Sequence, residues 1–143
     1  MTRYLPDVNV LVALIDGAHE HFERAQRWFL ADQDSEWIIS PLVQLGVIRV
    51  GSNPAFGPAA RPHEVVESLR SVLDQRQCTF VADDLDALDP GSLDHRAIAT
   101  HNQVTDVYLV ALAARHGAAL ATFDRKILTS AVISPAAEVY LIP

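Results

Sequence analysis

Three aspartates occupy positions in this chain where they could do chemistry together. Asp7 lies between two apolar segments near the start of the chain, and Asp124 directly follows another apolar segment. Asp106 falls in the first turn of a helix expected over 104–116. Three carboxylates in one pocket repel each other, and a hard divalent cation such as Mg²⁺ removes that conflict by binding them together with water. Such a site can activate water against a phosphodiester.

Each acid also has an ordinary structural explanation. An Asp between a strand and a helix is often the N-cap of that helix, which is the position of Asp7. An Asp in the first turn of a helix, such as Asp106, complements the helix dipole. Spacing alone therefore leaves both a set of structural acids and a metal site open.

The elements that must position these acids alternate along the chain. Short apolar stretches predict strands at 3–6, 36–40, 78–82, 118–123 and 137–142. Helical spacing of apolar residues predicts helices at 8–15, 19–31, 41–50, 63–76 and 104–116. Gly, Pro and acidic residues predict irregular connections at 51–62 and 83–102, the second with one short helix.

This alternation predicts one α/β domain over residues 1–143, with a parallel sheet covered by helices. Ligands of such sheets bind beyond the carboxyl ends of the strands, which is where Asp7 and Asp124 stand. A helix that starts near the same end would bring Asp106 to them.

Composition limits the class of protein. Half of the 143 residues are hydrophobic, which is enough for one real core, and the net charge is −7. An acidic chain argues against broad electrostatic capture of nucleic acid, although acids gathered at a metal site also add negative charge. Ten of the eleven basic residues are Arg, whose planar guanidinium suits phosphate contacts.

The expected compartment is the cytoplasm, without membrane association. No apolar run reaches the roughly 18 residues of a membrane helix, and the N-terminus lacks the pattern of a signal peptide. The one cysteine, Cys78, excludes an internal disulfide and is expected to be a small buried residue.

Other motifs favour ordinary structure over chemistry. HEVVE (63–67) lacks the second His of a zinc-protease helix, and HEH (19–21) is expected to be a solvated helix start. The acid-rich segment 83–94 lacks the Gly and Glu of a calcium loop, so it is expected to be a polar loop.

The stretches YLPDVNVLVAL (4–14) and VTDVYLVALAARHGAALATFDRK (104–126) resemble a PIN domain, most closely the VapC-type toxins of bacterial toxin–antitoxin pairs. PLVQLGVIRVGSNPAF (41–56) is similar to the middle of one VapC subgroup, so the resemblance covers essentially the whole chain. It implies a three-layer α/β/α sandwich and an Mg²⁺- or Mn²⁺-dependent endoribonuclease. It also implies a homodimer that a cognate antitoxin binds and inhibits.

The resemblance also implies roles for individual residues. The resemblance assigns metal binding and catalysis to three acids: Asp7, Asp106 and Asp124. Asn9 and Thr122 match positions that support the acids by hydrogen bonds. Arg49 matches a basic residue of the central helix, and Arg125 is a further candidate for phosphate contact.

One position departs from the family pattern. Gln44 stands where the family usually has Glu, and its neutral amide supplies neither charge nor a general base. This departure motivates an alternative: a PIN domain that binds RNA or an antitoxin with weak or no catalysis. A phosphatase or a DNA nuclease would use the same acids, so the residues leave that class open as well.

Overall fold

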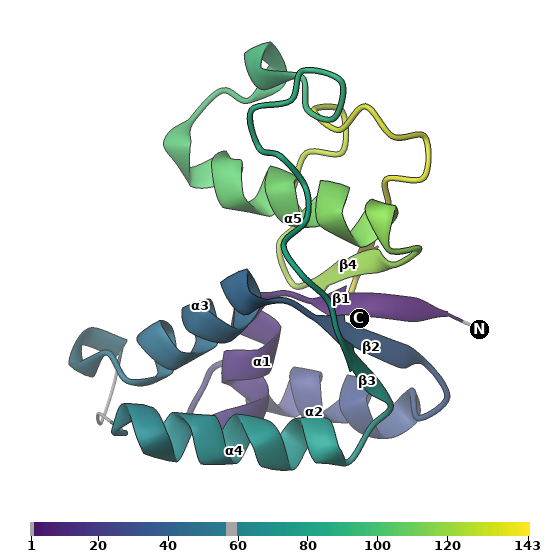
Figure 1. Ribbon diagram of the computed structural model, residues 1–143. Helices are drawn as coiled ribbons and strands as arrows, with labels where there is room; N and C mark the ends of the chain where they lie inside the picture. The colour runs from purple at the N-terminus through teal and green to yellow at the C-terminus, as the bar shows by residue number, and fades with distance from the viewer. Residues whose placement is uncertain (1, 57–59) are drawn as a thin grey trace.

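The computed structural model describes residues 2–56 and 60–143, and a five-stranded parallel sheet forms its centre (Figure 1). The strands, in the order in which they lie side by side, are β3 (Cys78–Phe80), β2 (Glu36–Ile39), β1 (Arg3–Pro6), β4 (Ala119–Thr122) and β5 (Val139–Leu141). Because β1 and β4 are parallel neighbours, the residues that follow them emerge at the same end of the sheet. We call this the carboxyl end.

Helices cover both faces of the sheet. Four of them, shown below the sheet in Figure 1, are α1 (Val8–Ile15), α2 (Phe22–Ala31), α3 (Pro41–Gly51) and α4 (Pro62–Asp74). The fifth, α5 (Val104–Arg115), lies alone on the other face. Among the described residues, three short 3₁₀ turns accompany these helices: Pro54–Phe56, His95–Ala97 and His101–Gln103. The predicted three-layer α/β/α sandwich is therefore confirmed.

The predicted elements are present, with shifted ends. The helix expected from residue 19 begins at Phe22, because the ring nitrogen Nδ1 of His19 accepts a hydrogen bond from the backbone N–H of His21 in the turn that precedes it. Segment 83–102 holds one 3₁₀ turn, His95–Ala97, and most of a second, His101–Gln103, instead of one short helix. The loop expected over 51–62 falls partly on 57–59, which lie outside the described residues, and its last residue already belongs to α4.

The core lies between the sheet and its helices, with Leu5, Trp37 and Leu120 at most 1 % exposed. One contact on the side of the four helices is unusually close. A Cβ added at Gly46 of α3 would stand 2.6 Å from Cγ2 of Val8, the first residue of α1. Glycine here lets α3 approach the start of α1, beside Asp7. None of the helices in the described ranges is long and apolar enough to cross a membrane.

Candidate active site

Asp7 caps α1 and is almost completely buried. It is 7 % exposed, and its Oδ1 accepts a hydrogen bond of 2.7 Å from the backbone N–H of Val8. Burial raises the pKa of Asp7, the bonds from Thr122 and Val8 oppose the rise, and the charge of Asp124 adds to it. The capping role is therefore real, but a cap alone does not require so costly a buried charge.

Thr122, at the end of β4, joins two of the predicted acids. Its hydroxyl donates to Oδ2 of Asp7 at 3.1 Å and accepts from the backbone N–H of Asp124, also at 3.1 Å. Thr122 is 1 % exposed, whereas Asp124 is exposed and holds its own turn by accepting from the N–H of Lys126. One buried hydroxyl thus ties the ends of β1 and β4 together.

Asp106 completes the group from the opposite face of the sheet. It lies half-buried in the first turn of α5, without a hydrogen bond to its side chain from the described residues. Burial, followed by the negative charges of Asp7 and Asp124, raises the pKa of Asp106 to about 6. The fold therefore brings all three acids into one electrostatic neighbourhood, which we call the acidic site.

No basic side chain of the described ranges forms an ion pair with the acidic site. The salt bridges of the described ranges all lie elsewhere: Arg3 pairs with Glu36, and both Arg115 and His116 pair with Asp84. His21 makes a longer contact with Glu20. The donor chemistry, three carboxylates without a counter-charge, fits a hard divalent cation. As the side chains stand, no three acidic, His or Cys groups of residues 2–56 and 60–143 already converge on one ion position.

The other predicted site residues make no hydrogen bond to the acidic site among the described residues. Gln44 is half-buried in the second turn of α3, and Asn9 is exposed in α1. Neither amide bonds to an acid among the described residues. Arg125 is exposed beside Asp124, and Arg49 is exposed in the last turn of α3. Both arginines are thus accessible to a phosphate from solution.

Sequence reasoning missed a residue that fixes the start of α3. Asp83 follows β3, and its carboxylate accepts a 2.9 Å bond from the backbone N–H of Leu42. The side chain of Ser40, the residue that precedes α3, makes no such bond. The partners are 41 residues apart in the chain, so no local sequence signal connects them.

Three other acids and Cys78 have structural roles. Asp84 lies 3.1 Å from Arg115 and 3.0 Å from His116, and Asp89 and Asp94 accept bonds within their own turns. Cys78 is half-buried in β3, and burial raises the pKa of its thiol to about 11. A protonated thiol is a poor nucleophile.

Comparison with known proteins gives one consistent result. The family model for the PIN domain matches residues 4–131. Ribonuclease VapC39 of Mycobacterium tuberculosis is 36 % identical over 132 residues, which cover 92 % of this chain and 94 % of that protein. Ribonuclease VapC38 of the same species is 38 % identical over 142 residues, which cover 96 % of each chain.

Solved structures agree on the fold. The crystal structure of M. tuberculosis VapC20, described as a sarcin–ricin loop cleaving toxin, has a TM-score of 0.64 at 11 % identity and covers 93 % of this chain and 98 % of its own. VapBC2 of Rickettsia felis, bound to a promoter DNA fragment, has a TM-score of 0.64 at 14 % identity and covers 98 % of both chains. The chain therefore belongs to the PIN-domain family and, within it, to the VapC group.

Proposed function

We propose that this chain is a divalent-metal-dependent endoribonuclease that hydrolyses RNA phosphodiesters, and that it is the toxin of a type II toxin–antitoxin pair in the cytoplasm. The observation that carries the proposal is the acidic site, in which a buried, a half-buried and an exposed carboxylate share one neighbourhood without a basic partner among the described residues. The curated relatives, which are named ribonucleases, support the choice of RNA.

Asp7, Asp106 and Asp124 would hold Mg²⁺ or Mn²⁺. When bound, the cation supplies a Lewis acid that stabilises phosphate charge and lowers the pKa of water. Thr122 and the N–H of Val8 fix the orientation of the Asp7 carboxylate, so little reorganisation is needed when substrate arrives. Arg125, exposed beside Asp124, contacts the phosphate of the strand.

The proposed antitoxin would bind in a cavity beside the acidic site. This cavity has a volume of about 750 Å³ and includes Asn9, two residues after Asp7. Apolar side chains from three helices contribute to its lining: Val12, Ile15, Val50 and Val65. Three acids contribute as well: Asp16, Glu20 and Glu64. An apolar lining with acids suits a basic, amphipathic segment of the antitoxin.

The proposed homodimer has support in exposed apolar side chains. Leu45 of α3 is 62 % exposed and Val104, at the start of α5, is 52 % exposed. Side chains of this size in solvent favour burial against a second copy. Light scattering of the purified protein at two concentrations tests the dimer, and a monomer at both would contradict it.

The decisive experiment measures cleavage of a structured RNA with Mg²⁺, with Mn²⁺ and with EDTA. We expect cleavage only with a divalent cation, and a loss of at least about 100-fold in Asp7→Asn, because the neutral amide removes a charged ligand. Asp74→Asn, at an exposed position in the last turn of α4, is the matched control. Cleavage that persists in EDTA or in Asp7→Asn would contradict the metal assignment, and preferential cleavage of DNA would contradict the substrate.

Gln44 supports a second function, namely binding of RNA or antitoxin with little catalysis. Its amide lies half-buried where the family usually has Glu, so the site has one negative charge fewer. Gln44→Glu separates the two functions, with Gln75→Glu at the end of α4 as the control. If the native site is attenuated, Gln44→Glu tightens Mg²⁺ binding and raises the cleavage rate about tenfold or more. An unchanged rate, in a protein that already cleaves, supports the endoribonuclease.

A further inference from the structure

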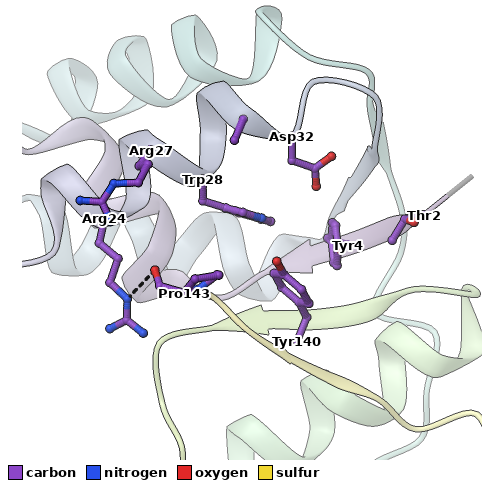
Figure 2. Close-up of a pocket in the computed structure, with 9 residues that line it drawn as sticks. Thr2, Tyr4, Arg24, Arg27, Trp28, Asp32, Tyr140 and Pro143 are labelled. Carbon is purple, nitrogen blue, oxygen red and sulfur yellow. Dashed lines mark hydrogen bonds between the residues drawn. The ribbon is translucent and has the colours of Figure 1, made fainter.

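A second cavity, of about 450 Å³, lies between α2 and β5 (Figure 2). Its wall is aromatic because β4 is built from small residues there. Ala119 is in register with Tyr4 of β1, and Ala121 with Tyr140 of β5. The alanines leave the sheet face open, so the two tyrosine rings meet above β4 with their centroids 4.9 Å apart. Trp28 of α2 closes the wall, edge-on to Tyr4 at 5.5 Å.

One end of this cavity has unsatisfied polar groups. Asp32 is the C-cap of α2, where the helix dipole disfavours an anion, and its half-buried carboxylate has no hydrogen bond or ion pair among the described residues. The indole N–H of Trp28, a residue only 6 % exposed, also lacks a partner there. Figure 2 shows the Trp28 ring, the Asp32 carboxylate and the Tyr140 hydroxyl around the same hollow. A buried donor and a half-buried acceptor without partners favour a ligand that supplies them.

The other end is basic. Arg24 and Arg27 of α2 line the cavity on the side away from Asp32 (Figure 2). Arg24 is anchored by donating to the backbone oxygens of Ile142 and Pro143, while Arg27 is exposed and pairs with no acid of the described ranges. Two guanidinium groups disfavour a cationic guest and favour an anionic one.

We propose that this cavity binds a guanine nucleotide. The Watson–Crick edge of guanine presents two adjacent N–H donors, which a carboxylate such as Asp32 accepts, whereas adenine presents only one donor there. The Trp28 N–H donates to an acceptor of the base, and the rings of Tyr4 and Tyr140 contact the base. The phosphate lies toward Arg24 and Arg27.

The position of Arg24 indicates that the nucleotide belongs to an RNA strand. The Arg24 guanidinium lies over the ring of Phe123, 4.8 Å from its centroid, and Phe123 directly precedes Asp124 of the acidic site. The phosphate end of the cavity thus faces the carboxyl end of the sheet. A chain with a net charge of −7 needs local contacts of this kind to hold RNA. This assignment to a strand rests on the proposed ribonuclease function, while binding of the nucleotide does not.

Calorimetry with GMP and AMP, in EDTA so that no cleavage occurs, tests the proposal. We expect GMP to bind with a Kd below about 1 mM and AMP about tenfold more weakly, because it lacks the paired donors. In ¹⁵N spectra, GMP is expected to shift the indole signal of Trp28. Asp32→Asn is expected to remove the preference for GMP. Arg27→Gln is expected to weaken the binding of GMP but not of guanosine. Arg70→Gln, on the exposed surface of α4, is expected to change neither affinity.

A short RNA distinguishes the two sources of the nucleotide. If an oligonucleotide with one unpaired G competes with GMP and its G→A counterpart does not, the site holds a base of the strand. If only free GMP binds, the site holds a mononucleotide. Absence of saturable GMP binding, or the same GMP affinity in Asp32→Asn as in the parent chain, would overturn the proposal. The proposed ribonuclease function is tested by a different measurement, the loss of RNA cleavage in Asp7→Asn, so a failure of one proposal can be distinguished from a failure of the other.

Discussion

At the amino end of the sheet, Glu36 is held by Arg3 at 3.0 Å and by the hydroxyl of Thr79 at 2.8 Å. The hydrogen bond from Thr79, followed by Arg3, keeps the pKa of that carboxyl below its usual range. At the carboxyl end, Asp7 also accepts from a threonine hydroxyl, but burial, with the negative charge of Asp124 added, raises its pKa. The same interaction, a hydrogen bond from a threonine hydroxyl on a neighbouring strand, therefore occurs at one carboxylate whose pKa is lowered and at another whose pKa is raised.

The difference separates acids that serve the fold from acids that serve a ligand. Glu36 connects three neighbouring strands through partners of its own, so the charge favours the folded state. The acidic site concentrates negative charge and forms no ion pair with a basic side chain of the described residues, which costs stability in the absence of a ligand. Perturbation of this kind, produced by burial and like charges together, is typical of functional sites.

The largest expected effect comes from removing each threonine hydroxyl while keeping its shape. Thr122→Val leaves Oδ2 of Asp7 without its donor and frees the backbone of Asp124. Cleavage is expected to fall about 100-fold, equivalent to roughly 2.7 kcal/mol, as the carboxylates lose their fixed orientation. Thr79→Val, the matched change at the amino end, is expected to leave cleavage unchanged and to lower the melting temperature.

Restoring the hydroxyl at position 122 distinguishes a role of Thr122 in positioning the acids from a role in folding. Thr122→Ser restores the hydroxyl and is expected to recover most of the activity, and it is measured beside Thr122→Val by kcat and by Mg²⁺ affinity. If Thr79→Val reduces cleavage as much as Thr122→Val, the functional contrast between the two ends is wrong.

A smaller effect is expected where α3 meets α1. Gly46→Ala places a methyl group 2.6 Å from the side chain of Val8, so the helices must move apart beside Asp7. We expect a loss of about 2 kcal/mol in the free energy of unfolding. Gly17→Ala, where nothing lies within 4 Å of the added carbon, is the control. Val8→Ala in the Gly46→Ala background is expected to recover part of the loss, and failure to recover any would exclude the steric cause.

Local patterns predicted the elements because those patterns act within a few residues. Pro41 lies in the first turn of α3, as expected of a helix start after a strand. Gly117 adopts φ of +68° just beyond α5, the left-handed conformation that glycine tolerates. The alternation of strands and helices then predicted a parallel sheet covered by helices, and the resemblance to a PIN domain predicted the three-layer α/β/α sandwich.

Contacts between distant segments were outside the reach of these patterns. The bond between Thr122 and Asp7 joins residues 115 apart in the chain, and it depends on β4 lying beside β1. The aromatic cavity depends on α2 and three separate strands, with Ala119 and Ala121 acting only by being small. Such features follow from strand order, which the sequence patterns did not specify.

The smallest expected effect is on the pH dependence of stability without metal. Asp106 in the folded chain stays protonated up to a pKa of about 6, against an ordinary value of 3.8. The folded state therefore binds more protons than the unfolded state between these values, and stability falls as the pH rises from about 4 to about 6. After screening by solvent at this half-buried position, the loss from Asp106 is about 1 kcal/mol.

Glu36 and Asp84, whose pKa values are lowered, act in the opposite direction, so the difference between variants isolates the acidic site. Asp106→Asn is expected to reduce the acid-side gain to the part that the raised pKa of Asp7 contributes, and Asp74→Asn is expected to retain all of it; urea unfolding at pH 4.5 and pH 7 measures both. A divalent cation is expected to stabilise the parent chain most at pH 7, where the carboxylates are charged, and to stabilise Asp106→Asn less. Equal slopes in all three proteins would show that Asp106 titrates as an ordinary surface acid, and the electrostatic contrast between the two ends of the sheet would then be lost.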